Sequence, residues 1–211
     1  GPKGSGKSTL AYHIINYIFS QNEDYPYISQ QHEINQKNRS YKLVQNNSHP
    51  NFYLIDLLDK KKNIEISQIR KMITYTNKSS FNNSSKFILI NNIENLNVHS
   101  SNALLKVIEE PNTSTFFILV HDSKKKILET IKSRCIAFKL NLSFIETVNI
   151  TNKLLDKNLF DLISYDLLNY YSTPGDYIKL INFSEDSQIN LNDFTLSNFL
   201  LFLINENFYK K

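Results

Sequence analysis

The sequence predicts an α/β fold followed by a small helical domain, and three observations lead to that prediction. Short continuous apolar runs at residues 52–57, 87–90 and 116–120 are typical of strands buried on both faces of a parallel sheet. Amphipathic stretches with helical spacing separate these runs, which is the alternation expected of βαβ units. After about residue 142 the strand-like runs stop and only helical patterns follow.

The elements of the α/β part follow one another in a simple order. Apolar residues at Leu10, Ala11, Ile14 and Ile15 predict a helix that ends near residue 19. Residues 20–51 are polar and weakly patterned, and they precede the first strand. Between the first and second strands we expect a helix capped by Ser67 and a loop over 78–86. A helix capped by Ser100 or Ser101 then leads to the third strand, and a short helix over 126–132 leads to a fourth strand over 136–140.

The helical part follows the last of these strands. Helices are expected over residues 144–155, 159–170 and 176–183, with a further apolar helix over 194–208. We therefore predict a nucleotide-binding domain over residues 1–142, a helical lid over 143–190 and the start of an incomplete helical region over 191–211. The chain opens without a methionine, inside a motif, so we expect it to be a fragment of a longer protein.

Composition excludes several classes of protein. The chain has 211 residues and 41% of them are hydrophobic, which is normal for a globular protein with a substantial core. Its single cysteine, Cys135, rules out an intrachain disulfide framework and a cysteine-rich zinc site, and it suits a reducing, cytoplasmic setting. Its apolar runs are far shorter than the ~20 residues of a membrane helix. A net charge of +4 permits contact with nucleic acid without requiring it.

Glycine is scarce, and its placement points to a phosphate-binding loop. Only four glycines occur, and three of them, Gly1, Gly4 and Gly6, lie in the first six residues. The opening Gly1-Pro2-Lys3-Gly4-Ser5-Gly6-Lys7-Ser8-Thr9 fits the pattern G-x-x-x-x-G-K-[ST]. Glycines let backbone N–H groups surround phosphate oxygens, and the following helix directs its positive end at the same anion. Lys7 is then expected to reach the β and γ phosphates of ATP, and the Ser8 hydroxyl to ligate Mg²⁺.

The same sequence lacks the acid that ATP hydrolysis requires. A hydrolysing P-loop protein places a carboxylate at the end of a nearby buried strand, to hold Mg²⁺ and to activate water. Here the strand over 87–90 is followed by Asn91 and Asn92, and Glu94 lies beyond the usual place. Asparagine carries no charge and cannot accept a proton. We therefore predict that the chain binds ATP weakly or does not hydrolyse it at a useful rate.

Two further motifs make the combination recognisable. Residues 101–111 form a capped amphipathic helix, Ser-Asn-Ala-Leu-Leu-Lys-Val-Ile-Glu-Glu-Pro, and Thr130-Ile131 precede Ser133-Arg134-Cys135. Together with the phosphate loop, this order resembles the clamp-loader branch of AAA+ proteins over residues 1–183. Within that branch it is most similar to the delta-prime subunits of bacterial DNA polymerase III.

The resemblance implies a role for each matching residue. Gly1 to Thr9 match the nucleotide-binding loop, and Arg134 matches an arginine finger that acts in trans on ATP bound by a neighbouring subunit. The implied partners are the other subunits of a hetero-oligomeric loader ring, the sliding clamp and primed DNA. The implied function is DNA replication as part of the polymerase holoenzyme, with little ATPase activity of the chain's own. Cys135 is then a small residue of the motif rather than a nucleophile.

Departures from the family pattern concern mainly the chain's own ATP chemistry. Asn91 and Asn92 replace the acidic pair, His121-Asp122-Ser123 stand at the sensor position, and Gly175 falls where a sensing arginine is expected. The four-cysteine zinc module of the family is absent from residues 20–51. Three alternatives stay open at this point: an active motor subunit of the same family, a P-loop kinase for a small molecule, and an ATP-driven repair or helicase-loading protein.

Overall fold

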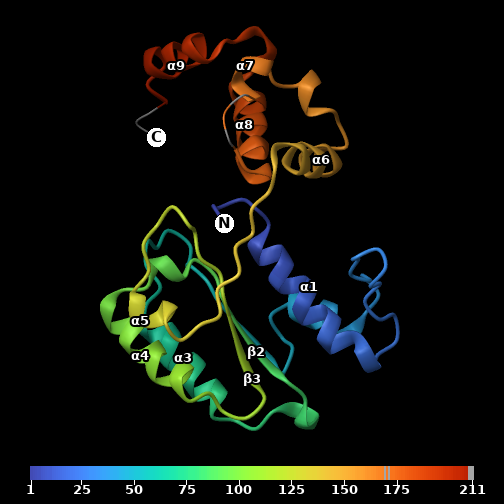
Figure 1. Cartoon of the computed structure of the whole chain (residues 1–211), viewed down its shortest axis with the longest axis vertical. Helices are drawn as coiled ribbons and strands as arrows, with labels where there is room; N and C mark the ends of the chain where they lie inside the picture. Colours follow the sequence, from blue (N-terminus) through green and yellow to red (C-terminus); the bar gives the residue numbers. More distant parts are fainter. Residues whose placement is uncertain (169, 171, 209–211) are drawn as a thin grey trace. The chain divides into compact units, whose positions relative to one another are not determined.

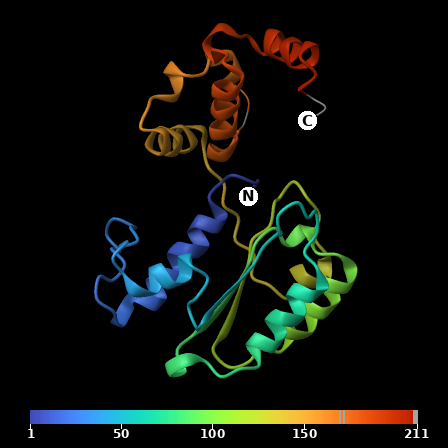
Figure 2. The same cartoon turned by 180° about the vertical axis from the view of Figure 1, so that it is seen from behind.

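The structure is a computed structural model that describes residues 1–168, 170 and 172–208. The chain divides into two compact units (Figures 1 and 2). The first contains Gly1 and Lys7–Lys139, and the second contains Pro2–Gly6 and Leu140–Lys211. The exact boundaries of the predicted domains over 1–142, 143–190 and 191–211 stay a prediction.

A parallel sheet forms the centre of the first unit, and the predicted α/β class is confirmed. Its three strands, β1 (Phe52–Ile55), β2 (Lys86–Ile90) and β3 (Thr115–Leu119), lie in the order β1-β2-β3. Ile55 pairs with Ile90, and Ile90 with Leu119, so the carboxyl ends of all three strands meet at one edge. Polar residues that follow these strands are thereby brought together.

Helices cover both faces of this sheet. On one face α3 (Ile66–Thr76), α4 (Val98–Glu109) and α5 (Glu129–Lys132) pack against Ile88 and Ile90. On the other face α1 (Lys7–Phe19) and α2 (Arg39–Gln45) pack against Phe87 and Leu89. Figures 1 and 2 show α3 and α4 on one side of the strands and α1 on the other. The alternation along β2 follows from the two-residue period of a strand, and it produces a three-layer unit.

The first residue of β2 is a buried lysine. Lys86 is 2% exposed. Its ammonium donates hydrogen bonds to the carbonyl oxygens of Lys78 at 2.5 Å and of Tyr75 at 3.3 Å. It also lies 4.8 Å from the centre of the Tyr75 ring. These acceptors stand at and just beyond the end of α3, where helix carbonyls lack partners within the helix. Burial lowers the pKa of Lys86.

Helix starts differ from the predicted caps. Helix α3 begins after Glu65 rather than at Ser67, because Glu65 and Gln68 form a reciprocal capping box. Helix α4 begins after Asn97, whose side chain accepts a hydrogen bond from the backbone N–H of Ser100 at 2.8 Å. Ser100 and Ser101 are buried inside that helix instead of capping it. Helix α2, inside the weakly patterned segment 20–51, was not predicted.

The strand predicted over residues 136–140 does not form. Its apolar side chains are exposed to solvent, with Ile136 at 85% and Phe138 at 89%. Within the described residues, the sheet has only three strands, and none of them pairs with this segment. An apolar run becomes a strand only where a neighbouring strand satisfies its backbone N–H and C=O groups, and here no such neighbour is present.

The second unit is helical, as predicted. Helices α6 (Phe144–Leu155) and α8 (Pro174–Ser187) pack together, and α9 (Leu196–Asn205) follows. The described side chains that form their shared core are Val148, Leu159, Ile163, Leu167, Leu168, Tyr177, Ile181, Leu191 and Phe199. Short 3-10 helices complete the two units at Ser20–Asn22, Phe81–Asn83, Ile93–Asn95, Leu159–Asp161 and Leu191–Asp193.

The helix predicted over 159–170 is interrupted. It is replaced by the 3-10 helix Leu159–Asp161 and by α7 (Tyr165–Leu168), and position 169 lies outside the described residues. Ser164 separates the two pieces because it bonds elsewhere: its backbone N–H reaches the carbonyl of Leu191 and its hydroxyl the carbonyl of Phe194. These bonds tie the segment to residues 191–194 instead of continuing a helix.

Candidate functional site

The glycine-rich loop has the backbone that the motif requires. Gly4 and Gly6 have positive φ angles of 84° and 79°, a region that residues with a Cβ adopt only with strain. Between them Ser5 is buried, and its hydroxyl donates a 2.8 Å hydrogen bond to the carbonyl of Pro2. A Cβ built on Gly6 would meet no atom within 4 Å other than those of its own chain neighbours. The loop is therefore curled, as expected of a phosphate cradle.

The start of α8 contacts this loop inside the second unit. The N–H of Gly175 donates to the carbonyl of Gly4 at 3.1 Å, and the Thr173 hydroxyl donates to the carbonyl of Lys3 at 3.0 Å. A Cβ on Gly175 would lie 2.8 Å from the Cα of Gly4. Glycine at 175 is thus required by the close approach of two backbones.

Lys7 opens helix α1, where the motif needs it. Burial lowers the pKa of Lys7, and the charges of Asp122 and Glu94 oppose that shift. An anionic phosphate would favour the charged ammonium as these two carboxylates do. The surroundings of Lys7 therefore suit a phosphate-binding lysine. Gly1 is fixed to the neighbouring loop, since its carbonyl accepts a hydrogen bond from the N–H of Ser123 at 3.1 Å. Thr9, in the first turn of α1, is exposed to solvent.

The Ser8 hydroxyl, the expected Mg²⁺ ligand, bonds to the residue at the end of β2. It donates a hydrogen bond to Oδ1 of Asn91 at 3.0 Å. The Asn91 amide in turn donates to Oδ2 of Asp56 at 3.0 Å. Asn92, in the left-handed region at φ 52°, donates to Oδ1 of Asp56 at 2.6 Å. The structure thus joins Ser8 to Asn91, and joins Asn91 and Asn92 to one carboxylate.

Sequence reasoning missed Asp56. The signal was present, since Asp56 directly follows the first predicted strand. The carboxyl ends of adjacent parallel strands lie side by side, so an acid after β1 falls next to residues that follow β2. Asp56 also accepts the N–H of Leu57 at 2.7 Å, which fixes its carboxylate.

Glu94 and Asp122 form a second, separate acidic pair in the first unit. The Glu94 side chain is 2% exposed, and it accepts a hydrogen bond from the N–H of Asp122 at 3.2 Å. Its other oxygen lies 4.0 Å from the ammonium of Lys125. No described contact links Glu94 to Ser8 or Asn91, so it does not take the place of the missing acid at the end of β2.

Arg134 follows α5 and is partly exposed. Its guanidinium forms an ion pair with Glu109, the last residue of α4, with the two side chains 38% and 44% exposed. It also donates to the carbonyl of Thr130 at 3.0 Å and to the Ser133 hydroxyl at 3.3 Å. These contacts engage all three guanidinium nitrogens, although the side chain stays partly exposed. Burial raises the pKa of the Cys135 thiol, which disfavours the reactive thiolate.

The donor set fits a magnesium nucleotide only in part. Ser8 and Asn91 offer neutral oxygens, the kind of hard ligand that Mg²⁺ prefers, but neither brings a negative charge. Among residues 1–168, 170 and 172–208, no group of three or more His, Cys, Asp or Glu side chains is placed to hold a metal ion. In the same part of the chain, none of the helices has the length and apolar character needed to cross a membrane.

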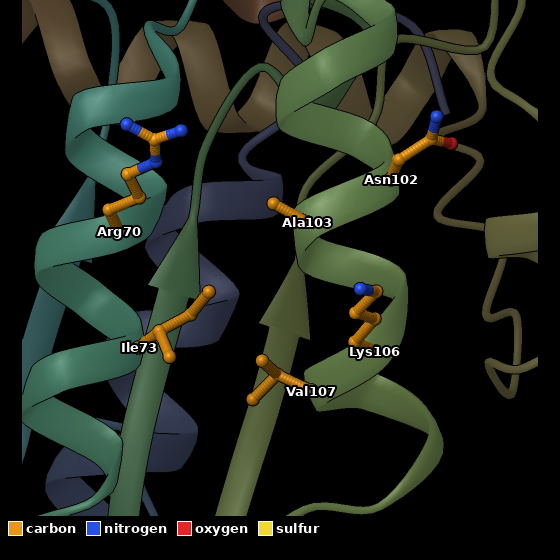
Figure 3. A pocket seen from close by; sticks show the side chains of 6 residues that line it. All are labelled: Arg70, Ile73, Asn102, Ala103, Lys106 and Val107. Atoms are coloured by element: carbon orange, nitrogen blue, oxygen red, sulfur yellow. The ribbon is translucent and has the colours of Figure 1, made fainter.

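A groove of about 410 Å³ lies on the sheet face opposite α1, between α3 and α4 (Figure 3). Arg70 and Lys106 stand at its rim, and Ile73, Ala103 and Val107 form its apolar floor (Figure 3). None of the residues predicted to bind nucleotide lines it. This groove is therefore distinct from the site built around the phosphate loop.

The curled loop, the parallel sheet and the following helical unit define a P-loop α/β protein of the AAA+ type. A family model described as DNA polymerase III, delta subunit, matches residues 1–143. The chain belongs to this family, within the clamp loaders, and the resemblance found in the sequence is confirmed.

The chain is also similar to individual proteins. The DNA polymerase III subunit delta' of Pseudomonas aeruginosa is 29% identical over 136 residues, which cover 64% of this chain and 40% of the relative. The subunit gamma of Buchnera aphidicola is 36% identical over 152 residues, 70% of this chain and 40% of the relative. A solved gamma subunit-related protein from Thermotoga maritima is 26% identical, with a TM-score of 0.43, and covers 49% of this chain and 34% of that chain. The chain spans about two fifths of the length of the first two relatives.

Proposed function

We propose that this chain is part of a clamp-loader subunit of the replicative DNA polymerase, which helps to place the sliding clamp on primed DNA. Its partners are the other subunits of a hetero-oligomeric ring, the clamp and the DNA, and it acts in the cytoplasm. The observation that carries the proposal is an asymmetry between two motifs. An amide, Asn91, bonds to Ser8 where hydrolysis needs an acid, whereas Arg134 is intact and partly exposed.

In this proposal the loop from Gly1 to Thr9 binds ATP or ADP. The backbone of Gly4 and Gly6 would receive the phosphates, Lys7 would balance their charge, and Ser8 would take part in holding Mg²⁺. Bound Mg²⁺ supplies charge neutralisation of the phosphates. Because the neutral Asn91 cannot accept a proton from water, the subunit binds nucleotide without hydrolysing it at a useful rate.

Arg134 would act on a neighbouring subunit. A guanidinium is planar, always charged and suited to two phosphate oxygens at once, and an arginine supplied in trans accelerates hydrolysis in other P-loop enzymes by 10³–10⁵. Glu109 would pair with the guanidinium until a phosphate of the neighbour's ATP replaces Glu109 as its partner. The alternative of an active motor subunit requires an acid in contact with Ser8, and the described contacts of Ser8 include only the amide of Asn91.

Two measurements test the proposal. The tagged full-length protein should co-purify with the other clamp-loader subunits, and the isolated subunit should bind ADP while turning over ATP far more slowly than a motor subunit. Turnover at a motor's rate would identify the active alternative. Phosphorylation of a small molecule without recovery of loader subunits would identify a kinase. Recovery with repair proteins or a helicase alone would favour the third alternative.

A further inference from the structure

A chain of hydrogen bonds links three residues from three elements of the first unit. Ser8 lies in the first turn of α1, Asn91 follows β2, and Asp56 follows β1. Ser8 Oγ and Asn91 Oδ1 are 3.0 Å apart, and Asn91 Nδ2 and Asp56 Oδ2 are also 3.0 Å apart. Asn91 is 8% exposed, so water competes little for these bonds. One buried amide therefore connects the motif serine to a carboxylate.

The carboxylate determines which way the amide faces. An ionised Asp56 can only accept hydrogen bonds, so the NH₂ group of Asn91 must point toward it. The carbonyl oxygen of the same amide is then directed at Ser8, where it accepts the hydroxyl proton. A second amide, that of Asn92, and the N–H of Leu57 complete the acceptor sites of Asp56. Asp56 is thereby held in place, and it in turn holds the Asn91 oxygen beside the Ser8 oxygen.

We propose that Ser8, Asn91 and Asp56 form a magnesium site. Its negative charge lies on Asp56, one hydrogen bond away from the ligand Asn91, rather than on a residue that touches the ion. In this site Ser8 and Asn91 provide the oxygen ligands, and Asp56 acts as a positioning residue that does not touch the ion. The inference rests on the proposed nucleotide binding and specifies how its metal is held. Carboxylates that orient metal ligands through a hydrogen bond commonly change metal affinity by 10–100-fold when they are removed.

A purely structural role for Asp56 makes a different prediction. In that case the two asparagines only tie the end of β2 to the end of β1, and any loss of these bonds lowers stability without altering the effect of Mg²⁺. Exchanging the two residues separates these roles. In D56N/N91D the amide introduced at position 56 can donate to the carboxylate introduced at position 91, which still accepts from Ser8. The number of donors and acceptors is kept, and only the position of the charge changes.

The experiment measures ADP affinity of the full-length protein in EDTA and in Mg²⁺, and compares the ratio of the two among four variants. These are D56N, N91D, D56N/N91D and the control N92G. The control removes one hydrogen bond to Asp56 and keeps the left-handed backbone, which glycine adopts freely. Melting temperatures with Mg²⁺ alone give a readout that does not depend on nucleotide.

The proposal expects the Mg²⁺ effect on ADP affinity to fall about tenfold in D56N, to rise above the wild-type value in D56N/N91D, and to fall less in N92G than in D56N, because N92G keeps the carboxylate and its bond to Asn91. N91D places two carboxylates together, so its melting temperature should drop and should recover with Mg²⁺. Equal Mg²⁺ effects in wild type and D56N/N91D would overturn the proposal even if D56N failed to fold. Absence of ADP binding in EDTA would overturn the nucleotide site itself, and this inference with it.

Discussion

The backbone N–H of Gly175 donates a hydrogen bond to the carbonyl oxygen of Gly4, 3.1 Å away. This bond joins the first turn of α8 to the phosphate loop within the second unit. The only glycine outside the first six residues thus lies against one of those that form the motif. The absence of a sensing arginine at position 175 acquires a physical reason, because any side chain there would meet the backbone of Gly4.

The first prediction concerns this contact. Gly175→Ala should lower stability by about 1–3 kcal/mol, because the added Cβ would lie 2.8 Å from the Gly4 Cα and force the two backbones apart. Helix propensity alone predicts the opposite sign, since alanine stabilises a helix by about 1 kcal/mol more than glycine does. Chemical denaturation of the full-length protein measures the change. Asn182→Ala, an exposed change in the same helix, is the control and should not destabilise. A more stable Gly175→Ala protein would contradict the described contact.

A second prediction concerns the partner of Arg134. Glu109→Gln removes the ion pair, but both side chains are partly exposed, so the free energy of unfolding should change by less than about 1 kcal/mol. If Glu109 positions the guanidinium, ATPase of the reconstituted loader should fall several-fold. Glu110→Gln, one residue further on, is the matched control. Unchanged ATPase would show that Arg134 needs no support from Glu109.

A third prediction concerns pH and His49. Its ring stacks on Phe19 with centroids 4.0 Å apart. Nδ1 accepts the N–H of Asn51, so Nε2 carries the proton and lies 3.1 Å from the Ser40 hydroxyl. Burial lowers the pKa of His49 below its ordinary value of 6.5, and Glu23 opposes this only in part.

The sign of the effect follows from that direction. A group with a lowered pKa in the folded state binds fewer protons folded than unfolded, so stability rises with pH across the interval between the two pKa values. The contribution of neutral His49 is complete above 6.5 and is lost as the pH falls. Melting temperatures measured from about pH 8 to about pH 5 should therefore decline, and His49→Gln should flatten part of that decline. His99→Gln, an exposed change, should leave the profile as it is; an equal effect of both changes would refute the assignment.

The fourth prediction concerns the buried lysine of β2. Lys86→Met keeps the apolar stem but removes the ammonium donor from the carbonyls of Tyr75 and Lys78, of which that of Tyr75 still accepts the backbone N–H of Lys78. The loss should be about 2 kcal/mol, the range for hydrogen bonds to a charged group. Urea denaturation measures it, with the exposed Lys71→Met as the control. A Lys86→Met protein at least as stable as wild type would show that burying the charge outweighs its bonds.

Much of the fold follows from local pattern. The three strands, α1 and the helix Phe144–Leu155 lie where apolar spacing predicts them, because each buries a face that its own sequence defines. The exposed segment over 136–140 has the same apolar character as a strand, and no local signal reveals that a neighbouring strand is missing. Ser67 and Ser100 compete with nearby Glu65 and Asn97 as caps, and the capping box of Glu65 with Gln68 and the bond from the Ser100 N–H to Asn97 decide between them.

The motifs of the site could be predicted from the sequence, but the contacts between its residues could not. Glycine spacing identifies the loop from Gly1 to Thr9, and its curled backbone is present. Asp56 and Glu109 were missed because each reaches its partner through a contact distant in sequence, 35 residues for Asp56 and Asn91 and 25 for Glu109 and Arg134. Such pairs are set by sheet order and helix packing rather than by spacing.

The central claim, that Arg134 serves ATP bound by a neighbouring subunit, is tested most directly in the reconstituted clamp loader. DNA-stimulated ATPase is measured with wild-type subunit, with Arg134→Ala, and with Lys132→Ala as an exposed control from the same segment. The account predicts a fall on the order of 10³ at the site that Arg134 serves, with the control unchanged and assembly of the ring intact. An ATPase rate equal to wild type in an assembled ring that contains Arg134→Ala would contradict it.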